Sequence, residues 1–162
     1  MKEFANLTDG GRHVAHPLAE LLSGRPAVLA PILPNGVPIA VGIAETLDLP
    51  IVPLAAARTE DGIEIAVSPE HVGATVVVVD DGVETGTAAR AAARALREGG
   101  AERVVLAVPV CPREALADLA LRYDDVVAVS TPMVRRSLAW HYADFDTVDQ
   151  AEALRLLDGP AS

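Results

Sequence analysis

The feature that most constrains the fold is a run of five residues, 75–79, that is entirely β-branched and passes directly into two aspartates and a small-residue turn. Such a run favours a strand that is buried on both faces of a parallel sheet. The Ala- and Arg-rich segment that follows, residues 88–98, has the composition of a helix and ends at a Gly-Gly pair. The chain therefore contains a strand–turn–helix unit of the kind from which α/β folds are built.

The same alternation continues along the rest of the chain. Pro17 is expected to perturb the first helix, Pro53 to place its strand at an edge or a strand end, and residues 62–67 to be a candidate for hairpin pairing. The alternation predicts an α/β fold with an open, mostly parallel twisted sheet and helices on both faces, in a single domain spanning residues 1–162. Strands are predicted at 27–32, 51–54, 62–67, 75–79, 103–110 and 125–129, and helices at 11–22, 37–47, 88–98, 112–122 and 148–157.

Composition narrows the functional classes. The 162 residues include 13 Lys plus Arg against 23 Asp plus Glu, a net charge of −10, with no basic cluster of the kind that binds nucleic acid. No apolar run is long enough to span a bilayer, and the N-terminus has no apolar core of a signal peptide. We therefore expect a cytoplasmic protein whose partners include neither nucleic acid nor a membrane.

Residues 80–88 carry the most chemistry. Asp80 and Asp81 are hydrogen-bond acceptors at the carboxyl end of a strand, where parallel α/β sheets bind ligands. Thr85-Gly86-Thr87, at the start of a helix, offers backbone N–H groups, hydroxyls and the positive end of the helix dipole to a phosphate. A ribose 5-phosphate combines hydroxyls and a phosphate at a matching separation. The alternative interpretation is an ordinary Asp-Asp-Gly turn with Thr85 as a helix N-cap.

Residues 76–88, VVVVDDGVETGTA, closely resemble the signature with which type I phosphoribosyltransferases bind 5-phosphoribosyl 1-diphosphate (PRPP). Residues 33–40 look like the diphosphate loop of that family, and residues 107–110 look like its later core strand. Residues 131–145 are similar to a bacterial subgroup of phosphoribosyltransferases with no settled substrate. The resemblance implies an enzyme that transfers phosphoribosyl from PRPP to a nitrogenous base and releases diphosphate.

The resemblance also implies roles for individual residues. Asp80 and Asp81 would hold the ribose hydroxyls of PRPP or of a nucleoside 5-monophosphate. Mg²⁺ would bind through PRPP, with no direct protein ligand. Glu84 would contact the base or act as general acid or base, although a carboxylate in a loop is more commonly just solvated. The 5-phosphate loop would comprise Val83, Glu84, Thr85, Gly86, Thr87 and Ala88, and the diphosphate loop Pro34, Asn35 and Gly36, with Arg58 as either a diphosphate contact or a surface charge.

Three departures from the family pattern keep a second hypothesis open. The diphosphate loop lacks Lys and Arg, and Ala88 stands where a hydroxyl residue is often found. Residues 55–62 form a shorter connection than the long loop that closes over the reaction in relatives, so the lid and the base-binding hood are expected to be small. The alternative is a non-catalytic regulatory module that binds PRPP or a nucleotide. A phosphatase is a weaker third reading, because the Asp-x-Asp spacing of aspartyl phosphatases is absent.

The remaining candidates lie near the ends of later strands. Cys111 is expected to be a small buried side chain rather than a nucleophile, and the four histidines show no metal-binding spacing. Arg135 and Arg136 are either contacts to an acidic substrate or surface charges. Trp140 and Tyr142 either stack on a base or pack in the interface of a homodimer, and the interface is favoured.

Overall fold

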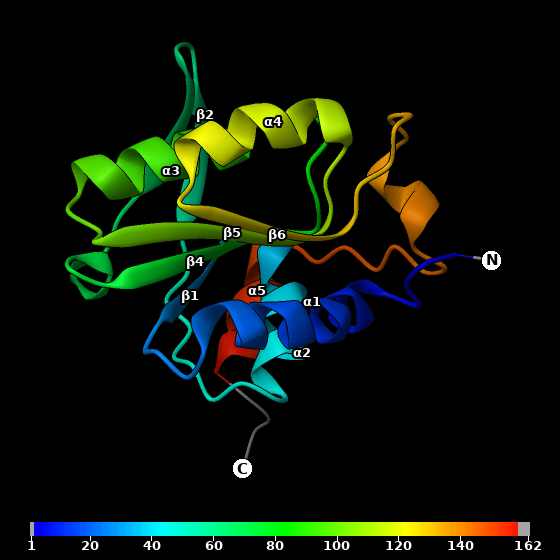
Figure 1. The fold of residues 1–162 in the computed structure, drawn as a ribbon, viewed down its shortest axis with the longest axis horizontal. Coiled ribbons are helices and arrows are strands. Elements are labelled where there is room, and N and C mark those ends of the chain that lie inside the picture. Colours follow the sequence, from blue (N-terminus) through cyan, green and yellow to red (C-terminus); the bar gives the residue numbers. More distant parts are fainter. Residues whose placement is uncertain (1, 159–162) are drawn as a thin grey trace.

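The computed structural model describes residues 2–158, and its centre is a four-stranded parallel sheet in the order β1-β4-β5-β6. Figure 1 shows the sheet between two layers of helices, with α3 and α4 on one face and α1 and α2 on the other, while α5 lies against α2. The predicted α/β fold with helices on both faces is confirmed. The bounds are α1 (Leu7–Leu22), β1 (Val28–Pro31), α2 (Gly36–Ala44), β4 (Thr75–Val79), α3 (Thr87–Glu98), β5 (Arg103–Val110), α4 (Arg113–Arg122), β6 (Asp125–Ser130) and α5 (Gln150–Leu157).

The core is aliphatic and lies on both faces of the sheet. In β4, Val77 and Val79 pack in the cluster beneath α1 and α2, whereas Val76 and Val78 pack in the cluster beneath α3 and α4. All four side chains are fully buried. The β-branched run therefore forms a central strand, because both of its faces have to be apolar.

Helix α1 differs from its prediction. It begins at Leu7 rather than at residue 11, and it continues through Pro17 without a break. The side chain of Asn6 caps the helix by accepting a hydrogen bond from the Asp9 amide at 2.8 Å. Burial of Val14 and Leu18 against the sheet outweighs the one hydrogen bond that proline cannot donate. The helix neither ends nor restarts at Pro17.

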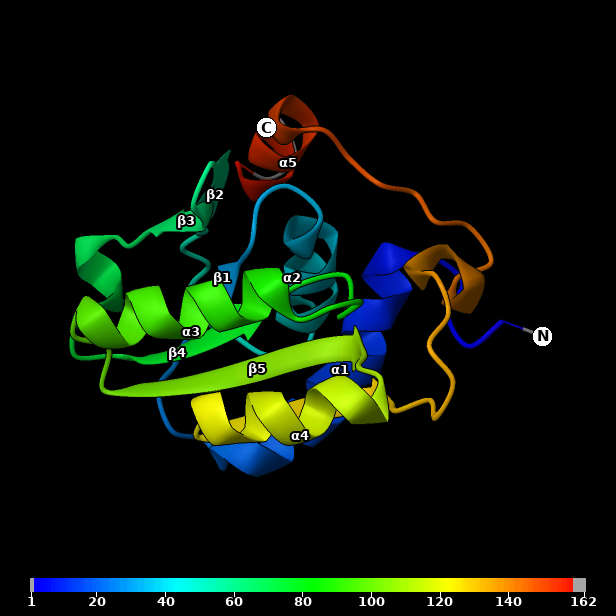
Figure 2. The same cartoon turned by 90° about the horizontal axis from the view of Figure 1, so that it is seen from above.

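The region between α2 and β4 also differs from its prediction. Residues 51–54 form only two isolated parallel bridges beside β1, Leu29 with Ile51 and Ile32 with Leu54. The amides of Val52 and Leu54 donate to Leu29 and Pro31, but Pro31 has no N–H with which to continue the ladder. The strand lies instead at β2 (Ala55–Thr59), which pairs in antiparallel fashion with β3 (Gly62–Ala66). Figures 1 and 2 show this hairpin projecting from the sheet beside α3. Hairpin pairing of the 62–67 strand is confirmed, whereas residues 55–62, expected only as a connection, form β2 and the turn.

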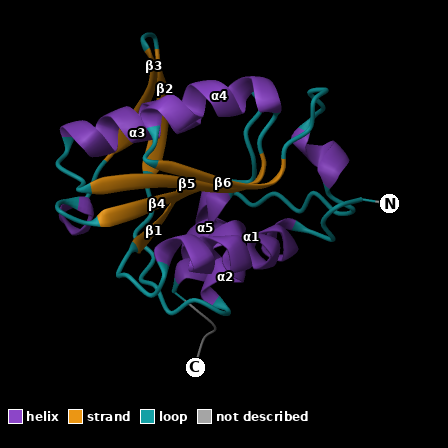
Figure 3. Ribbon diagram, in the orientation of Figure 1, coloured by secondary structure: helices purple, strands orange, loops and turns teal. Residues whose placement is uncertain are grey.

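Two short 3-10 helices complete the chain, η1 (Pro69–His71) and η2 (Leu138–His141). Figure 3 shows that η2 interrupts a long loop that leads from β6 to α5. Part of this loop pairs with the N-terminal residues, since Phe4 and Tyr142 form a parallel bridge. Within residues 2–158, no helix combines the length and the apolar character needed to cross a bilayer. A cytoplasmic location stays a prediction.

Candidate functional site

A cleft of about 210 Å³ lies where β4 and β5 end. The loop between β4 and α3 forms most of its wall, the β2–β3 hairpin contributes from one side, and η2 contributes one leucine. The cleft thus brings together three segments that are far apart in the sequence. It is lined by Ile32, Arg58, Ile63, Asp80, Asp81, Gly82, Val83, Glu84, Thr85, Gly86, Thr87, Ala88, Ala89, Leu106, Val108 and Leu138.

The two aspartates lie at the floor of the cleft in an environment that disfavours their charge. The Asp80 carboxylate accepts a hydrogen bond from the Asp81 amide at 2.9 Å, and Asp81 is only 8% exposed. Burial raises the pKa of Asp81 to about 6. Burial and the neighbouring charge of Asp81 hold the pKa of Asp80 well above its usual range. Hydroxyl groups that donate to these carboxylates would replace the water that burial removes.

The loop that follows holds backbone donors without partners. Gly86 adopts a left-handed conformation (φ 87°) and occupies the N-cap position of α3 with no side-chain cap. The amides of residues 84–88 donate to no acceptor within the described part of the chain. The interpretation of Thr85 as a helix N-cap is therefore wrong, and the first turn is open to an anion. The hydroxyls of Thr85 and Thr87 lie 3.1 Å apart beside these amides.

Val83 differs from the other residues assigned to the phosphate loop. Its amide donates to the Val110 carbonyl at 2.9 Å, and its side chain is buried. The Val83 amide is thus already used in joining the loop to the end of β5. The set of amides available to a phosphate begins at Glu84.

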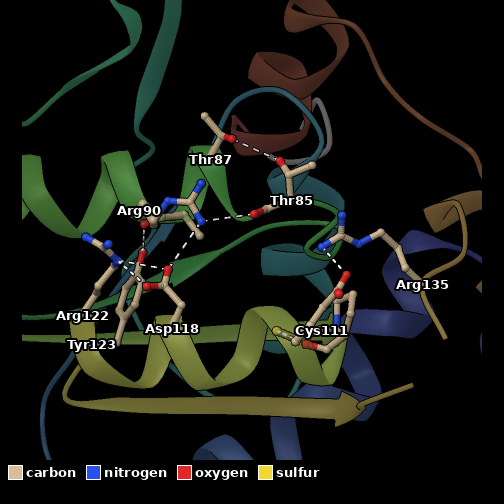
Figure 4. Close-up of polar contacts among 11 residues, drawn as sticks. Thr85, Thr87, Arg90, Cys111, Asp118, Arg122, Tyr123 and Arg135 are labelled. Carbon is tan, nitrogen blue, oxygen red and sulfur yellow. Dashed lines mark hydrogen bonds and ion pairs between the residues drawn. The ribbon is translucent and has the colours of Figure 1, made fainter. Parts of the chain in front are cut away.

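Sequence reasoning missed Arg90, a residue in the first turns of α3. Figure 4 shows the Arg90 guanidinium between the Thr85 carbonyl, to which its Nη1 donates at 3.2 Å, and Asp118, 3.4 Å away. Asp118 also pairs with Arg122. Arg90 therefore places a positive charge beside the open amides. An arginine five residues after Thr85 was the available signal, but arginines on helices are more commonly just solvated.

The loop after β1 lies next to the end of β4, and of its residues Ile32 lines the cleft. The Leu33–Pro34 peptide bond is cis, and a Cβ on Gly36 would lie 2.5 Å from the Val79 carbonyl. The Asn35 side-chain carbonyl accepts from the Val148 amide at 2.9 Å, which leaves the NH₂ group of the amide as a donor. The residues predicted to form the diphosphate loop, Pro34, Asn35 and Gly36, do not line the cleft.

Arg58 and Glu84 stand at the edges of the cleft. Arg58 comes from β2, opposite Ile63 in β3, and is the one Lys or Arg among the cleft-lining residues of the described chain. The Glu84 carboxylate is exposed and accepts from the Leu138 amide at 3.4 Å. The cleft thus has a cation at the hairpin and a carboxylate near η2.

The aromatic candidates separate into a buried and a partly exposed residue. Tyr142 is 2% exposed and packs in the core against Phe4 and Phe145, so the predictions that place it on a base or in a dimer interface are wrong. Trp140 is partly exposed, with the side chains of Lys2 and Arg136 over its ring. A homodimer stays a prediction.

Two other candidates have structural partners. Arg135 forms an ion pair with Glu114 at 2.5 Å (Figure 4). Cys111 is buried, and burial raises the pKa of its thiol to about 11. The thiol is therefore protonated at neutral pH and acts as a small apolar side chain, as expected.

The chemistry of the site fits a magnesium ion that arrives with a phosphorylated ligand. Within residues 2–158 there is no group of three or more His, Cys, Asp or Glu side chains arranged to hold a metal. The donors present are the oxygens of Asp80 and Asp81 at the floor and of Glu84 at the edge. Mg²⁺ commonly binds through substrate phosphates and one or two carboxylates rather than in a protein cage.

Comparison with known proteins identifies similar sequences and folds. The family model described as "Phosphoribosyl transferase domain" matches residues 2–138. "Putative phosphoribosyl transferase Rv0571c" of Mycobacterium tuberculosis is 28% identical over an alignment of 209 positions, which covers 98% of this chain and 47% of the relative. The chain thus spans about half the length of the curated relatives that it matches.

Solved structures share the fold. The protein TT1426 from Thermus thermophilus superposes with a TM-score of 0.83 at 25% identity, covering 97% of this chain and 98% of the other. A Neisseria gonorrhoeae protein with bound ppGpp has a TM-score of 0.60 at 18% identity, covering 98% and 97%. A hypoxanthine-guanine phosphoribosyltransferase from Bacillus anthracis has a TM-score of 0.57 at 12% identity, covering 67% and 70%. The last two show similarity of fold alone.

Proposed function

Because the chain belongs to the phosphoribosyl transferase domain family, we propose that it binds PRPP in the cleft at the end of β4 and transfers the phosphoribosyl group to a nitrogenous base. The observation that carries this proposal is one cleft that combines two desolvated carboxylates with a row of backbone amides that have no acceptor within residues 2–158. These groups match the hydroxyls and the phosphate of a 5-phosphorylated ribose.

Ribose binding rests on Asp80 and Asp81. Both carboxyls are buried enough to raise their pKa values, so hydroxyl donors gain more from hydrogen bonds to them than to a solvated carboxylate. The 2- and 3-hydroxyls of the ribose are a pair of such donors. This interaction orients the sugar over the end of β4.

Phosphate binding rests on the turn before α3. The amides of residues 84–88 and the hydroxyls of Thr85 and Thr87 donate to the 5-phosphate, and the positive end of the α3 dipole favours its charge. Arg90 adds a cation that is held in place by the Thr85 carbonyl and Asp118. A phosphate is thereby bound without a lysine in the loop.

The leaving group and the base occupy the two edges of the cleft. Arg58 faces the diphosphate and places a positive charge beside the leaving group. Mg²⁺, when carried into the cleft by PRPP, would supply further positive charge there. The bond from ribose C1 to the diphosphate oxygen breaks, and its electron pair leaves with the diphosphate. A bond from C1 to a base nitrogen forms. Glu84, near η2, accepts the proton that the base nitrogen loses.

The experiment that tests this function is calorimetry with PRPP and Mg²⁺, followed by an assay for diphosphate in the presence of purine and pyrimidine bases. We expect binding by the wild-type protein, release of diphosphate with one class of base, and lower turnover in Glu84→Ala. No binding of PRPP would overturn the proposal. Unchanged turnover in Glu84→Ala would remove Glu84 from the mechanism and leave the rest standing.

A second candidate, a non-catalytic module that binds a nucleotide, is favoured by the loop after β1. That loop contains no Lys or Arg, and the one residue it contributes to the cleft is the apolar Ile32, so diphosphate has few partners there. The fold is also shared with a Neisseria gonorrhoeae protein that has bound ppGpp. This candidate would be favoured if the protein bound PRPP or a nucleotide but released no diphosphate when PRPP was offered with any of the bases.

A further inference from the structure

The C-terminal loop, taken from η2 to the start of α5, contacts both loops that face the ligand in the proposed function. Leu138 donates its amide to Glu84, and Val148 donates its amide to the Asn35 side chain. Between them, Tyr142 reaches Asp81. Residues 139–148 lie beyond the stretch that matches the family model.

The contact from Tyr142 is the most direct of the three. Its hydroxyl donates to the backbone carbonyl of Asp81 at 2.7 Å in a buried environment. The ring is fixed from two sides by Phe4 and Phe145, with ring centroids 5.4 Å away in each case. The hydroxyl therefore has one defined position, and the carbonyl that it binds belongs to one of the two aspartates at the floor of the cleft.

The backbone at this point has an uncommon and closely packed conformation. Gly82 follows with φ 149°, a conformation that side chains rarely adopt, and a Cβ there would lie 2.6 Å from Leu138 Cδ2. The direction of the Asp81 carbonyl fixes the peptide plane between Asp81 and Gly82. A buried carbonyl without a donor would be costly, so loss of the tyrosine hydroxyl favours rotation of that plane and displacement of the carboxylate.

We propose that Tyr142 is a positioning residue that holds the Asp81 carboxylate in its ribose-binding orientation through the backbone of the turn. This inference rests on the proposed function. It assigns to the C-terminal loop a part in ligand binding that is separate from residues 84–88, the turn before α3 that we call the phosphate turn. The phosphate contacts begin at Glu84 and are joined to β5 through Val83, not through Tyr142.

The test compares two probes in Tyr142→Phe, which removes the hydroxyl and keeps the ring. Ribose 5-phosphate needs both the aspartates and the phosphate turn, whereas inorganic phosphate needs only the turn. We expect the affinity for ribose 5-phosphate to fall about three- to tenfold, the effect of one buried hydrogen bond, and the affinity for inorganic phosphate to stay within about twofold. Calorimetry gives both affinities, and thermal melting checks the fold.

Tyr123→Phe is the matched control. Tyr123 is equally buried, and its hydroxyl donates to the Ala89 carbonyl at 2.6 Å, so the substitution removes the same kind of hydrogen bond from α3 rather than from the aspartates. It is expected to affect ribose 5-phosphate no more than inorganic phosphate. Phe4→Leu is a second variant, which loosens the packing on Tyr142 while the hydroxyl remains, and it is expected to change the ratio of the two affinities less than Tyr142→Phe does.

The outcomes separate the two levels of the argument. Equal losses for both probes in Tyr142→Phe, or an unchanged affinity for ribose 5-phosphate, would overturn the inference while wild-type binding keeps the proposed function. A Phe4→Leu effect as large and as selective as that of Tyr142→Phe would also overturn it, because packing would then be responsible. Failure of the wild-type protein to bind ribose 5-phosphate would overturn the proposed function itself.

Discussion

The loops after β4 and after β1 both lie at the carboxyl ends of the parallel strands, yet they differ in how many of their backbone amides are hydrogen-bonded within the protein. After β4, the amides of residues 84–88 have no acceptor in the described chain. After β1, Leu33 donates to Leu54, Gly36 donates to Ile32, and Pro34 has no amide hydrogen. In this loop, only the Asn35 amide has no acceptor within residues 2–158. The loop after β4 thus keeps a row of unused donors, whereas most amides of the loop after β1 are used in hydrogen bonds within the protein.

This difference shows that a loop can resemble a ligand-binding loop for two separate reasons. A turn can match a family pattern because the chain has to bend there, or because its donors are needed by a ligand. Free donors distinguish the two cases, since backbone N–H groups are normally satisfied within the protein. By this criterion the loop after β4 is the stronger candidate for a ligand loop, and in the proposed function the diphosphate relies on Arg58 of the hairpin.

The largest expected effect comes from removing both charges at the floor of the cleft. In Asp80→Asn/Asp81→Asn, we expect affinity for PRPP with Mg²⁺ to fall at least about 100-fold, because hydrogen bonds to charged groups contribute about 1.5–3 kcal/mol each. Calorimetry measures the affinity, and Asp48→Asn is the control, because Asp48 lines a separate pocket at the amino ends of the strands. A loss below about threefold would mean that the phosphate turn alone carries binding.

The second effect is on stability and depends on pH. The pKa of Asp81 is about 6 in the folded protein, above the value of about 4 in an unfolded chain. The folded state then binds more protons, so stability is present at low pH and is lost as pH rises from about 4 to about 6. We expect Asp81→Asn to raise the free energy of unfolding by about 2 kcal/mol at pH 8 and to have little effect at pH 4.

Urea unfolding of Asp81→Asn and of the wild type at the two pH values checks this prediction. The Asp124→Asn variant is a suitable contrast, since Asp124 accepts from the Val104 amide outside the cleft and its charge has partners. A pH-independent difference between Asp81→Asn and the wild type would show that burial of the Asp81 charge does not destabilise the fold.

The third effect isolates the hairpin. In Arg58→Ala, we expect the affinity for PRPP to fall about tenfold while the affinity for ribose 5-phosphate changes less than about twofold, because only PRPP carries the diphosphate. The ratio of the two affinities, measured by calorimetry, is the informative quantity. Arg94→Ala on the exposed face of α3 is the matched control, because the ion pair of Arg94 is with Glu98, outside the cleft. Equal losses for both ligands would contradict the assignment of Arg58 to the diphosphate.

The smallest effect is expected in the loop after β1. Asn35→Ala removes one amide donor and the bond to Val148, and we expect the affinity for PRPP to fall no more than about threefold. A loss comparable to that in Arg58→Ala would erase the contrast between the two loops. The same calorimetric titration gives this result, and the melting temperature shows how much of the change comes from the lost contact with Val148.

Much of the fold could be predicted because its information is local. Residues 75–98 form strand, turn and helix where their composition indicates, since β-branched residues favour a buried strand and Ala-rich segments favour a helix. Strand β2 could not be predicted in this way. Residues 55–57 are three alanines, which have no preference for a strand, and β2 is formed by its pairing with β3.

The candidate site divides in the same way. Asp80, Asp81 and the phosphate turn are contiguous in the sequence, so one pattern identifies them together. Tyr142 lies 61 residues from Asp81 along the chain, and its contact with the Asp81 carbonyl depends on how the C-terminal loop folds back. Composition favours a role for an aromatic residue in an interface, and only the packing of the core shows that Tyr142 is internal.

The two cleft aspartates also connect ligand binding to the acidity of the solution. Their raised pKa values mean that the free protein retains protons there at mildly acidic pH. A ligand whose hydroxyls donate to ionised carboxylates binds the deprotonated form of the protein, so binding is coupled to the release of protons. The apparent affinity then rises with pH through the region near 6, and the heat of binding varies with the ionisation enthalpy of the buffer that takes up the released protons.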